Sequence, residues 1–247
     1  MRKYKSICIS DVHLGTQGCK AEWLCDFLKT NTSDNLFLVG DIIDGWALKR
    51  HFHFPQSHMN VIRRILTAAK RGTNVIYLPG NHDEILRQLI RFDLSFGNVE
   101  IKNQYIYKAV NGKSYIICHG DMFDTALQGN LKFLYHLGDY VYDILLSMNT
   151  AVTFFRRLAG LGHWSFSAYV KDKTKAVVKF ISDYENLIAD YCKRKCVDGI
   201  ICGHIHQAAI KEINGITYMN DGDWVESCTA LVEHHDGTWE IVKCRIV

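Results

Sequence analysis

The chain has 247 residues, of which 48% are hydrophobic and 22% charged, so it can bury a sizeable core and is not a disordered protein. Its net charge of +3 is too small to indicate nucleic-acid binding by itself. The longest apolar segment, residues 144–155, is too short to cross a bilayer, which excludes a transmembrane helix there.

Short apolar runs alternate with helical patterns in the first half of the chain. Three runs predict buried strands, at residues 6–10, 35–41 and 74–81. Between them, residues 21–30 and 59–72 carry apolar side chains at helical spacing, and Gly72 is expected to cap the second helix. This alternation predicts a parallel sheet covered by helices.

The second half of the chain has a different pattern. Three segments predict β-hairpins, because two-residue turn sequences separate their apolar runs, at Asn111–Gly112, Asn214–Gly215 and Asp236–Gly237. Residues 122–197 show helical periodicity without a strand signal. We therefore expect a single domain over 1–247, with a core of 1–121 and 198–247 and a helical cap insertion at about 122–197.

The cysteines and the N-terminal residues indicate the expected cellular compartment. None of the nine cysteines forms a Cys-x-x-Cys pair, which predicts reduced thiols in a cytoplasmic protein. The apolar stretch within residues 1–10 is too short for a signal peptide.

Polar side chains follow five predicted strands. The segments are DVH with Asp11 and His13, GDIID with Asp41 and Asp44, GNHD with Asn81, His82 and Asp83, HGD with His119 and Asp121, and GHIH with His204 and His206. Because ligands bind at the carboxyl ends of strands in open α/β sheets, we expect these segments to converge on one pocket.

The residue types in these segments point to metal binding. In an extended segment His204 and His206 face the same way, as two ligands of a metal site would. Mixed histidine, aspartate and asparagine donors suit Mn, Fe, Zn or Co. A carboxylate shared by two such ions would hold them about 3.5–4 Å apart, the arrangement used to hydrolyse phosphate esters.

Each segment alone has a structural alternative. Aspartate after a strand often caps a helix, and a pair of histidines can simply bond to neighbouring groups. Five such segments in one chain favour the functional interpretation.

The ordered series DVH, GDIID, GNHD, HGD and GHIH resembles the calcineurin-like metallophosphoesterase superfamily. The resemblance implies an α/β fold, a two-sheet αββα sandwich with a helical cap insertion. It also implies two divalent metal ions, with Mn²⁺ expected first and Fe, Zn or Co as alternatives, and a bridging hydroxide that attacks phosphorus.

The resemblance also assigns roles to individual residues. One metal would be held by Asp11, His13, Asp41 and His206, and the other by Asp41, Asn81, His119 and His204, with Asp41 bridging. His82 would stabilise the phosphoryl group or protonate the leaving oxygen, and Asp83 would orient His82. Asp44 and Asp121 are expected to hold ligand histidines.

Within the superfamily, the length, the predicted insertion and GDIIDGW resemble the UDP-2,3-diacylglucosamine diphosphatases of lipid A synthesis. That implies cleavage of a nucleotide-linked lipid to UMP and a lipid monophosphate, with Trp46, Lys171, Lys173 and Lys175 as substrate-binding candidates. One departure is His82, where the lipid A enzymes usually carry arginine. That histidine is the pattern of general phosphoesterases.

Alternatives remain at this stage. The chain could be a general phosphodiesterase, a nucleotide phosphatase or a nuclease, although no long basic stripe predicts specific nucleic-acid binding. A non-catalytic scaffold is a further alternative, against which all seven ligand positions are filled. Trp46 could pack in the core, the lysines could form a solvated helix face, and the cap could be a packed helical subdomain. A lipid substrate would favour peripheral contact with the inner membrane.

Overall fold

The structure is a computed structural model that describes residues 2–90, 98–124 and 182–244. The chain divides into two compact units, one formed by Met1–Asp121 with Ile188–Val247 and the other by Met122–Leu187. The second unit is described only at its two ends, so the predicted cap over 122–197 lies largely outside the described residues. Within the described ranges, no helix has both the length and the apolar character needed to cross a membrane.

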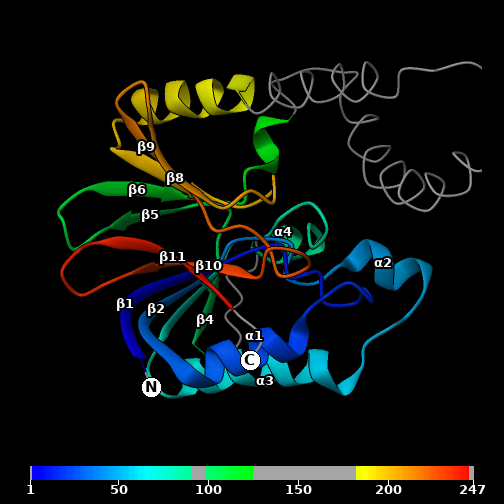
Figure 1. Ribbon diagram of the computed structural model, residues 1–247. Helices are drawn as coiled ribbons and strands as arrows, with labels where there is room; N and C mark the ends of the chain where they lie inside the picture. Colours follow the sequence, from blue (N-terminus) through cyan, green and yellow to red (C-terminus); the bar gives the residue numbers. More distant parts are fainter. Residues whose placement is uncertain (1, 91–97, 125–181, 245–247) are drawn as a thin grey trace, which may run out of the picture. The chain divides into compact units, whose positions relative to one another are not determined.

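The first unit contains two mixed β-sheets (Figure 1). One has the order β11-β10-β1-β2-β3-β4, with bounds Trp239–Lys243, Thr229–Glu233, Arg2–Ile9, Asn31–Leu38, Asn74–Tyr77 and Val99–Ile101. The other has the order β5-β6-β7-β9-β8, with bounds Tyr105–Lys108, Ser114–Ile117, Gly199–Cys202, Ile216–Asn220 and Ala209–Ile213. The four strands β1 to β4 run parallel, as do β6, β7 and β9.

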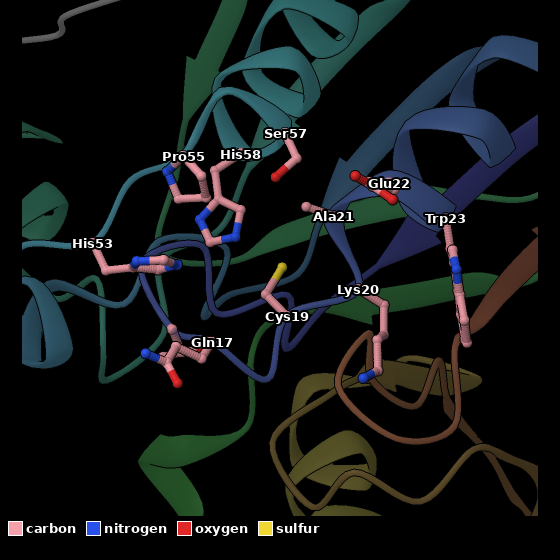
Figure 2. A pocket seen from close by; sticks show the side chains of 11 residues that line it. Gln17, Cys19, Lys20, Ala21, Glu22, Trp23, His53, Pro55, Ser57 and His58 are labelled. Carbon is pink, nitrogen blue, oxygen red and sulfur yellow. The ribbon is translucent and has the colours of Figure 1, made fainter.

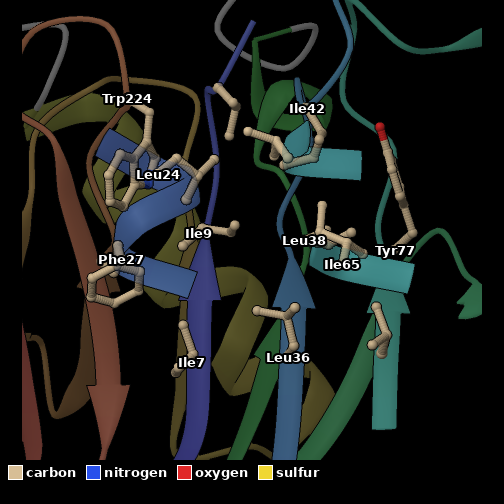
Figure 3. Packing of buried hydrophobic residues seen from close by; sticks show 14 of the residues in the cluster. Ile7, Ile9, Leu24, Phe27, Leu36, Leu38, Ile42, Ile65, Tyr77 and Trp224 are labelled. Atoms are coloured by element: carbon tan, nitrogen blue, oxygen red, sulfur yellow. The ribbon is translucent and has the colours of Figure 1, made fainter. Parts of the chain in front are cut away.

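Helices α1 (Ala21–Thr30) and α3 (Gln56–Lys70) lie together on the outer face of the first sheet (Figure 1). Figure 3 shows the packing: Ile7 and Ile9 of β1 and Leu36 and Leu38 of β2 point to the side where Leu24, Phe27 and Ile65 of the helices lie. This alternation arises because successive side chains of a strand point to opposite faces. The shorter elements are α2 (Gly45–Arg50), α4 (Ile85–Leu89) and the 3₁₀ helix η2 (Asp121–Phe123).

The opposite faces of the same strands build a second core between the sheets. Cys8, Phe37 and Ile76 of the first sheet pack there with Ile117 and Ile201 of the second, all at most 1% exposed. Strands buried on both faces explain why the sequence shows continuous apolar runs instead of strict alternation.

The predicted strands, the helix over 21–30 and the three hairpins are confirmed. The second helix begins at Gln56, three residues before the predicted start, and its C-cap is Arg71. Gly72 follows with φ +95°, a left-handed conformation that glycine adopts without steric cost.

A buried polar network crosses between the two sheets. Glu233 of β10 is fully buried, and its carboxylate accepts hydrogen bonds from Ser6 Oγ at 3.0 Å, Tyr107 Oη at 2.6 Å and the Val110 backbone N–H at 2.8 Å. Because Tyr107 belongs to the second sheet, this network fixes the two sheets relative to each other.

We expect Tyr107→Phe to destabilise the protein by about 1.5–3 kcal/mol, the usual loss for a hydrogen bond to a charged group. Chemical denaturation would measure the change, and phosphoesterase activity at 25 °C should stay unchanged. Tyr105→Phe on the same strand is the matched control, since Tyr105 makes no contact with Glu233 among those found in the described residues. Equal destabilisation by the two variants would contradict the assigned role.

Candidate metal centre and active site

All seven predicted metal ligands follow the carboxyl ends of parallel strands. Asp11 and His13 follow β1, Asp41 follows β2, and Asn81 follows β3 of the first sheet. His119 follows β6 of the second sheet, and His204 and His206 follow β7. The centre is therefore assembled from both sheets at one end of the sandwich.

Five of these seven residues have a left-handed backbone. Their φ angles lie between 49° and 71°, at Asp11, His13, Asp41, His204 and His206. For a residue with a Cβ this conformation costs about 1–2 kcal/mol, and such residues cluster at functional sites. The fold thus holds these side chains in positions that relaxed strand ends would not provide.

The first group of possible ligands contains Asp11, His13 and His206, whose donor atoms all lie within 4.8 Å of one another. His206 Nε2 is 3.1 Å from Asp11 Oδ1, and His13 Nε2 is 4.0 Å from the same oxygen. Burial alone would lower the pKa of His206, but the Asp11 carboxylate raises it to about 9. Protons and cations therefore compete for this group.

The second group contains Asp11, Asp41 and His119, also within 4.8 Å. His119 Nε2 lies 3.2 Å from Asp41 Oδ2, and its Nδ1 lies 2.9 Å from the Val39 carbonyl oxygen, which fixes the ring. Burial raises the pKa of Asp41, but His119 outweighs it and brings the value to about 2.

His204 stands beside this second group. Its ring centroid lies 5.0 Å from that of His119, and its backbone N–H donates to Asp11 Oδ2 at 2.9 Å. It belongs to none of the groups of close donor atoms found among the described residues.

Several donor atoms of the predicted ligands lack a well-aligned hydrogen-bond partner. In the described part of the chain, Asp11 Oδ1, Asn81 Oδ1 and His119 Nε2 are buried and make no well-aligned hydrogen bond, and the nearest groups to Asp11 Oδ1 and His119 Nε2 are their ion-pair partners His206 and Asp41. Buried polar atoms nearly always have hydrogen-bond partners, so polar atoms without a well-aligned one, gathered at one place, indicate that a ligand belongs there. Oxygen and imidazole donors of this kind fit divalent metal ions.

His82 belongs to a third group of close donor atoms, together with His13 and Asp41, all within 4.8 Å of one another. Its Nδ1 is 3.0 Å from Asp44 Oδ2, and its Nε2 is 4.0 Å from Asp41 Oδ2. Trp46, a substrate-binding candidate, packs on the His82 ring with centroids 4.3 Å apart. Burial opposes protonation, but Asp44 and Asp41 outweigh it and raise the pKa of His82.

Asp44 contacts both His82 and the predicted metal ligand His13. The same Oδ2 atom lies 3.1 Å from Nδ1 of the predicted ligand His13, and Oδ1 accepts from Ala47 N at the start of α2. Asp44 thus fixes His13 and His82 relative to each other and to α2.

The structure corrects the predicted partner of His82. Asp83 accepts hydrogen bonds from Ile42 N, Tyr77 Oη and Gly80 N, so it orders the backbone around the site, and Asp44 holds His82 in its place. Burial, with repulsion from Asp41, raises the pKa of Asp83.

The hydrogen-bond partner of Asp121 also differs from the prediction. Its Oδ1 accepts from Arg87 Nη2 at 2.8 Å, so its observed partner is an arginine and not a ligand histidine. The side chains of Lys171, Lys173 and Lys175 lie outside the described residues.

Sequence reasoning missed a hydrogen-bonded pair behind Asp11. Ser10 Oγ donates to Asp11 Oδ2 at 2.5 Å and lies 2.7 Å from Asp221 Oδ1, with all three residues at most 1% exposed. Burial, with repulsion from Asp11, raises the pKa of Asp221 well above its usual value. The signal available in the sequence was the place of Asp221 after the second strand of the hairpin predicted around Asn214–Gly215.

Glycines next to the ligands allow close packing. A Cβ on Gly40 would collide with the His119 ring, and one on Gly80 would collide with the Asp41 carboxylate. These two collisions explain why glycine precedes Asp41 in GDIID and Asn81 in GNHD.

We expect Gly40→Ala to lower metal content and activity, because the new methyl group displaces His119. Gly112→Ala is a matched control, since Gly112 has nearly the same φ (+82° against +85°) but open space around it. Gly112→Ala should lose about 1 kcal/mol of stability, and Gly40→Ala should lose more because its methyl group also displaces a buried ring. Only Gly40→Ala should lose bound metal, as measured by elemental analysis, and equal metal content would contradict the packing argument.

Comparison with known proteins agrees with this geometry. The profile of the calcineurin-like phosphoesterase family matches residues 4–208. The chain belongs to this family, and it is a metal-dependent phosphoesterase with an α/β fold of two mixed sheets.

The individual proteins that the chain resembles share little sequence identity with it. The UDP-2,3-diacylglucosamine hydrolase of Blochmanniella pennsylvanica (strain BPEN) is 27% identical over 214 residues, covering 83% of this chain and 80% of that protein. Among solved structures, an archaeal phosphodiesterase shares 12% identity with a TM-score of 0.45, covering 96% of this chain and 98% of the other. Yfce, a phosphoesterase from E. coli, shares 13% identity with a TM-score of 0.44, covering 97% and 99%.

Proposed function

We propose that the chain hydrolyses the pyrophosphate bond of UDP-2,3-diacylglucosamine, releasing UMP and a lipid monophosphate. The observation that carries this proposal is the similarity to a UDP-2,3-diacylglucosamine hydrolase over most of both chains. The site supports it chemically, because clustered histidine and aspartate donors suit hydrolysis at phosphorus.

In this proposal two divalent ions, with Mn²⁺ first, are held by Asp11, His13, Asp41 and His206 and by Asp41, Asn81, His119 and His204. When bound, such ions lower the pKa of a coordinated water and neutralise charge on phosphate oxygens.

The side chains beside the metal groups have separate tasks. Asp44 holds the Nδ1 side of His82, and Trp46 packs on its ring, so Nε2 keeps a fixed direction. The raised pKa of His82 favours the protonated ring, which carries a proton on Nε2 as well as on Nδ1. His82 can therefore donate a hydrogen bond to the phosphoryl group and transfer the proton to the leaving oxygen as the P–O bond breaks.

The decisive experiment incubates the purified protein and Mn²⁺ with UDP-2,3-diacylglucosamine and measures UMP by chromatography. We expect UMP release that is lost in Asp41→Asn and unchanged in Asp34→Asn, a surface aspartate that pairs with Lys3 and Lys5. Hydrolysis of an aryl phosphodiester without any UMP release would reject this substrate while keeping the enzyme class.

His82 favours a second candidate, a general phosphodiesterase, because the lipid A enzymes usually carry arginine there. In that case His82→Arg should lower activity on the aryl phosphodiester. If UDP-2,3-diacylglucosamine is the substrate, the same variant should retain UMP release. Comparing both substrates in both proteins separates the candidates.

A further inference from the structure

A cavity of about 260 Å³ lies beside the loop that follows His13, at the first turns of α1 and α3 (Figure 2). Its lining residues include none of the predicted metal ligands. One contact links the two places: Gly15, two residues after the predicted ligand His13, donates its backbone N–H to His58 Nδ1 at 3.0 Å.

Two helix N-termini meet at this cavity. Helix α1 starts at Ala21 and α3 at Gln56, and neither preceding residue, Lys20 or Pro55, caps its helix through a side chain. Ala21 and Ser57 from the two first turns both line the cavity. Because helix N-termini carry partial positive charge and unpaired N–H groups, two of them together favour an anion.

His58 adds a buried donor. It is 3% exposed, and because Nδ1 accepts from Gly15, the proton of the neutral ring is on Nε2. Burial, with His53 nearby, lowers the pKa of His58, so the ring stays neutral at pH 7. Figure 2 shows the ring directed toward the space that Cys19 also faces, and the described residues supply no hydrogen-bond acceptor for Nε2.

The side chains that line the cavity do not place a negative charge inside it. Burial raises the pKa of Cys19 to about 12, so its thiol stays neutral beside the first N–H of α1. Glu22 is the one carboxylate among the lining residues, and it is exposed. Lys20 also lines the cavity and carries a positive charge at the same helix end, where its Nζ lies 5.9 Å from the centroid of the Trp23 ring.

We propose that this cavity binds a small oxyanion of the phosphate class, held by the first turns of α1 and α3, the Nε2–H of His58 and Lys20. The anion is either free inorganic phosphate or the phosphate group of a nucleotide. This inference does not depend on the lipid substrate proposed above.

The test uses the full-length chain loaded with Zn²⁺, which is diamagnetic, and inorganic phosphate as the probe. The imidazole ¹⁵N resonances of His58, assigned with His58→Gln, report binding at this cavity separately from binding at the metals. We expect a saturable shift of the Nε2 resonance with phosphate. Lys20→Met should weaken the apparent affinity about tenfold, the usual effect of losing a charge-assisted contact.

Two matched variants sharpen the result. Lys29→Met removes the same charge from the other end of α1 and should leave the affinity unchanged, whereas Glu22→Gln removes a repulsive carboxylate and should strengthen binding.

A second titration uses UMP. A His58 shift at lower UMP than phosphate, weakened by Lys20→Met, identifies a nucleotide phosphate, and equal or weaker binding of UMP identifies free phosphate. A His58 resonance that phosphate does not move, or equal affinities in Lys20→Met and Lys29→Met, would overturn the proposal.

Discussion

Asp41→Asn should reduce phosphoesterase activity by about 10³-fold or more, since metal-assisted charge stabilisation at phosphorus is worth several kcal/mol. Asp41 is 2% exposed, and its Oδ2 lies 3.2 Å from His119 Nε2 while its Oδ1 accepts from His82 N at 2.8 Å. Asparagine keeps the shape and can still accept from His82 N, but it lacks the negative charge that two cations would share. Steady-state kinetics with an aryl phosphodiester and elemental analysis of bound metal would measure both effects.

The control for this prediction is Asp34→Asn, the same chemical change on the surface. Circular dichroism should show both variants folded. Activity of Asp41→Asn within tenfold of the original protein, at full metal content, would remove Asp41 from the proposed bridging position.

His82→Asn should lower kcat by about 10²–10⁴-fold, the usual contribution of a general acid, without lowering metal content. The reason is that His82 is held by Asp44 and Trp46 and is not needed as a ligand in the proposed arrangement. Asn removes the transferable proton but leaves a polar side chain of smaller size. Kinetics and metal analysis on one preparation separate a role of His82 in proton transfer from a role as a metal ligand.

His234→Asn provides the matched control, because His234 pairs with Glu240 at 2.8 Å on the surface, within the β10–β11 hairpin. Loss of one equivalent of metal in His82→Asn would instead assign His82 as a ligand. That alternative is chemically reasonable, since the donor atoms of His13, Asp41 and His82 lie within 4.8 Å of one another.

The parts of the fold that depend on local sequence were predictable. The turns at Asn111–Gly112 and Asn214–Gly215 specify hairpins through their backbone preferences, and the apolar runs after Lys5 and Asn74 specify buried strands. The two-sheet arrangement came from the family resemblance, because no local pattern tells a strand which face of another sheet it will cover.

The sequence predicts that the side chains of the site gather at the strand ends, but it does not predict their contacts with one another. Strand-end positions bring the candidate ligands together, yet the pairing of His82 with Asp44 depends on where α2 begins, which spacing does not give. Likewise Asp83 was assigned by motif, whereas its contacts with Tyr77 and Ile42 follow from the path of the backbone. The Ser10–Asp221 contact joins residues more than two hundred positions apart, and the place of Asp221 at the end of a strand does not tell which residue it contacts.

The origin of the candidate ligands in both sheets has a mechanical consequence. A cation coordinated by Asp11 from one sheet and His206 from the other acts as a cross-link between the two layers. Chelation should then loosen the sandwich at that end while the Glu233 network keeps the layers in register elsewhere. Hydrogen exchange of β7 and β1 amides, compared with and without EDTA, would follow this opening directly.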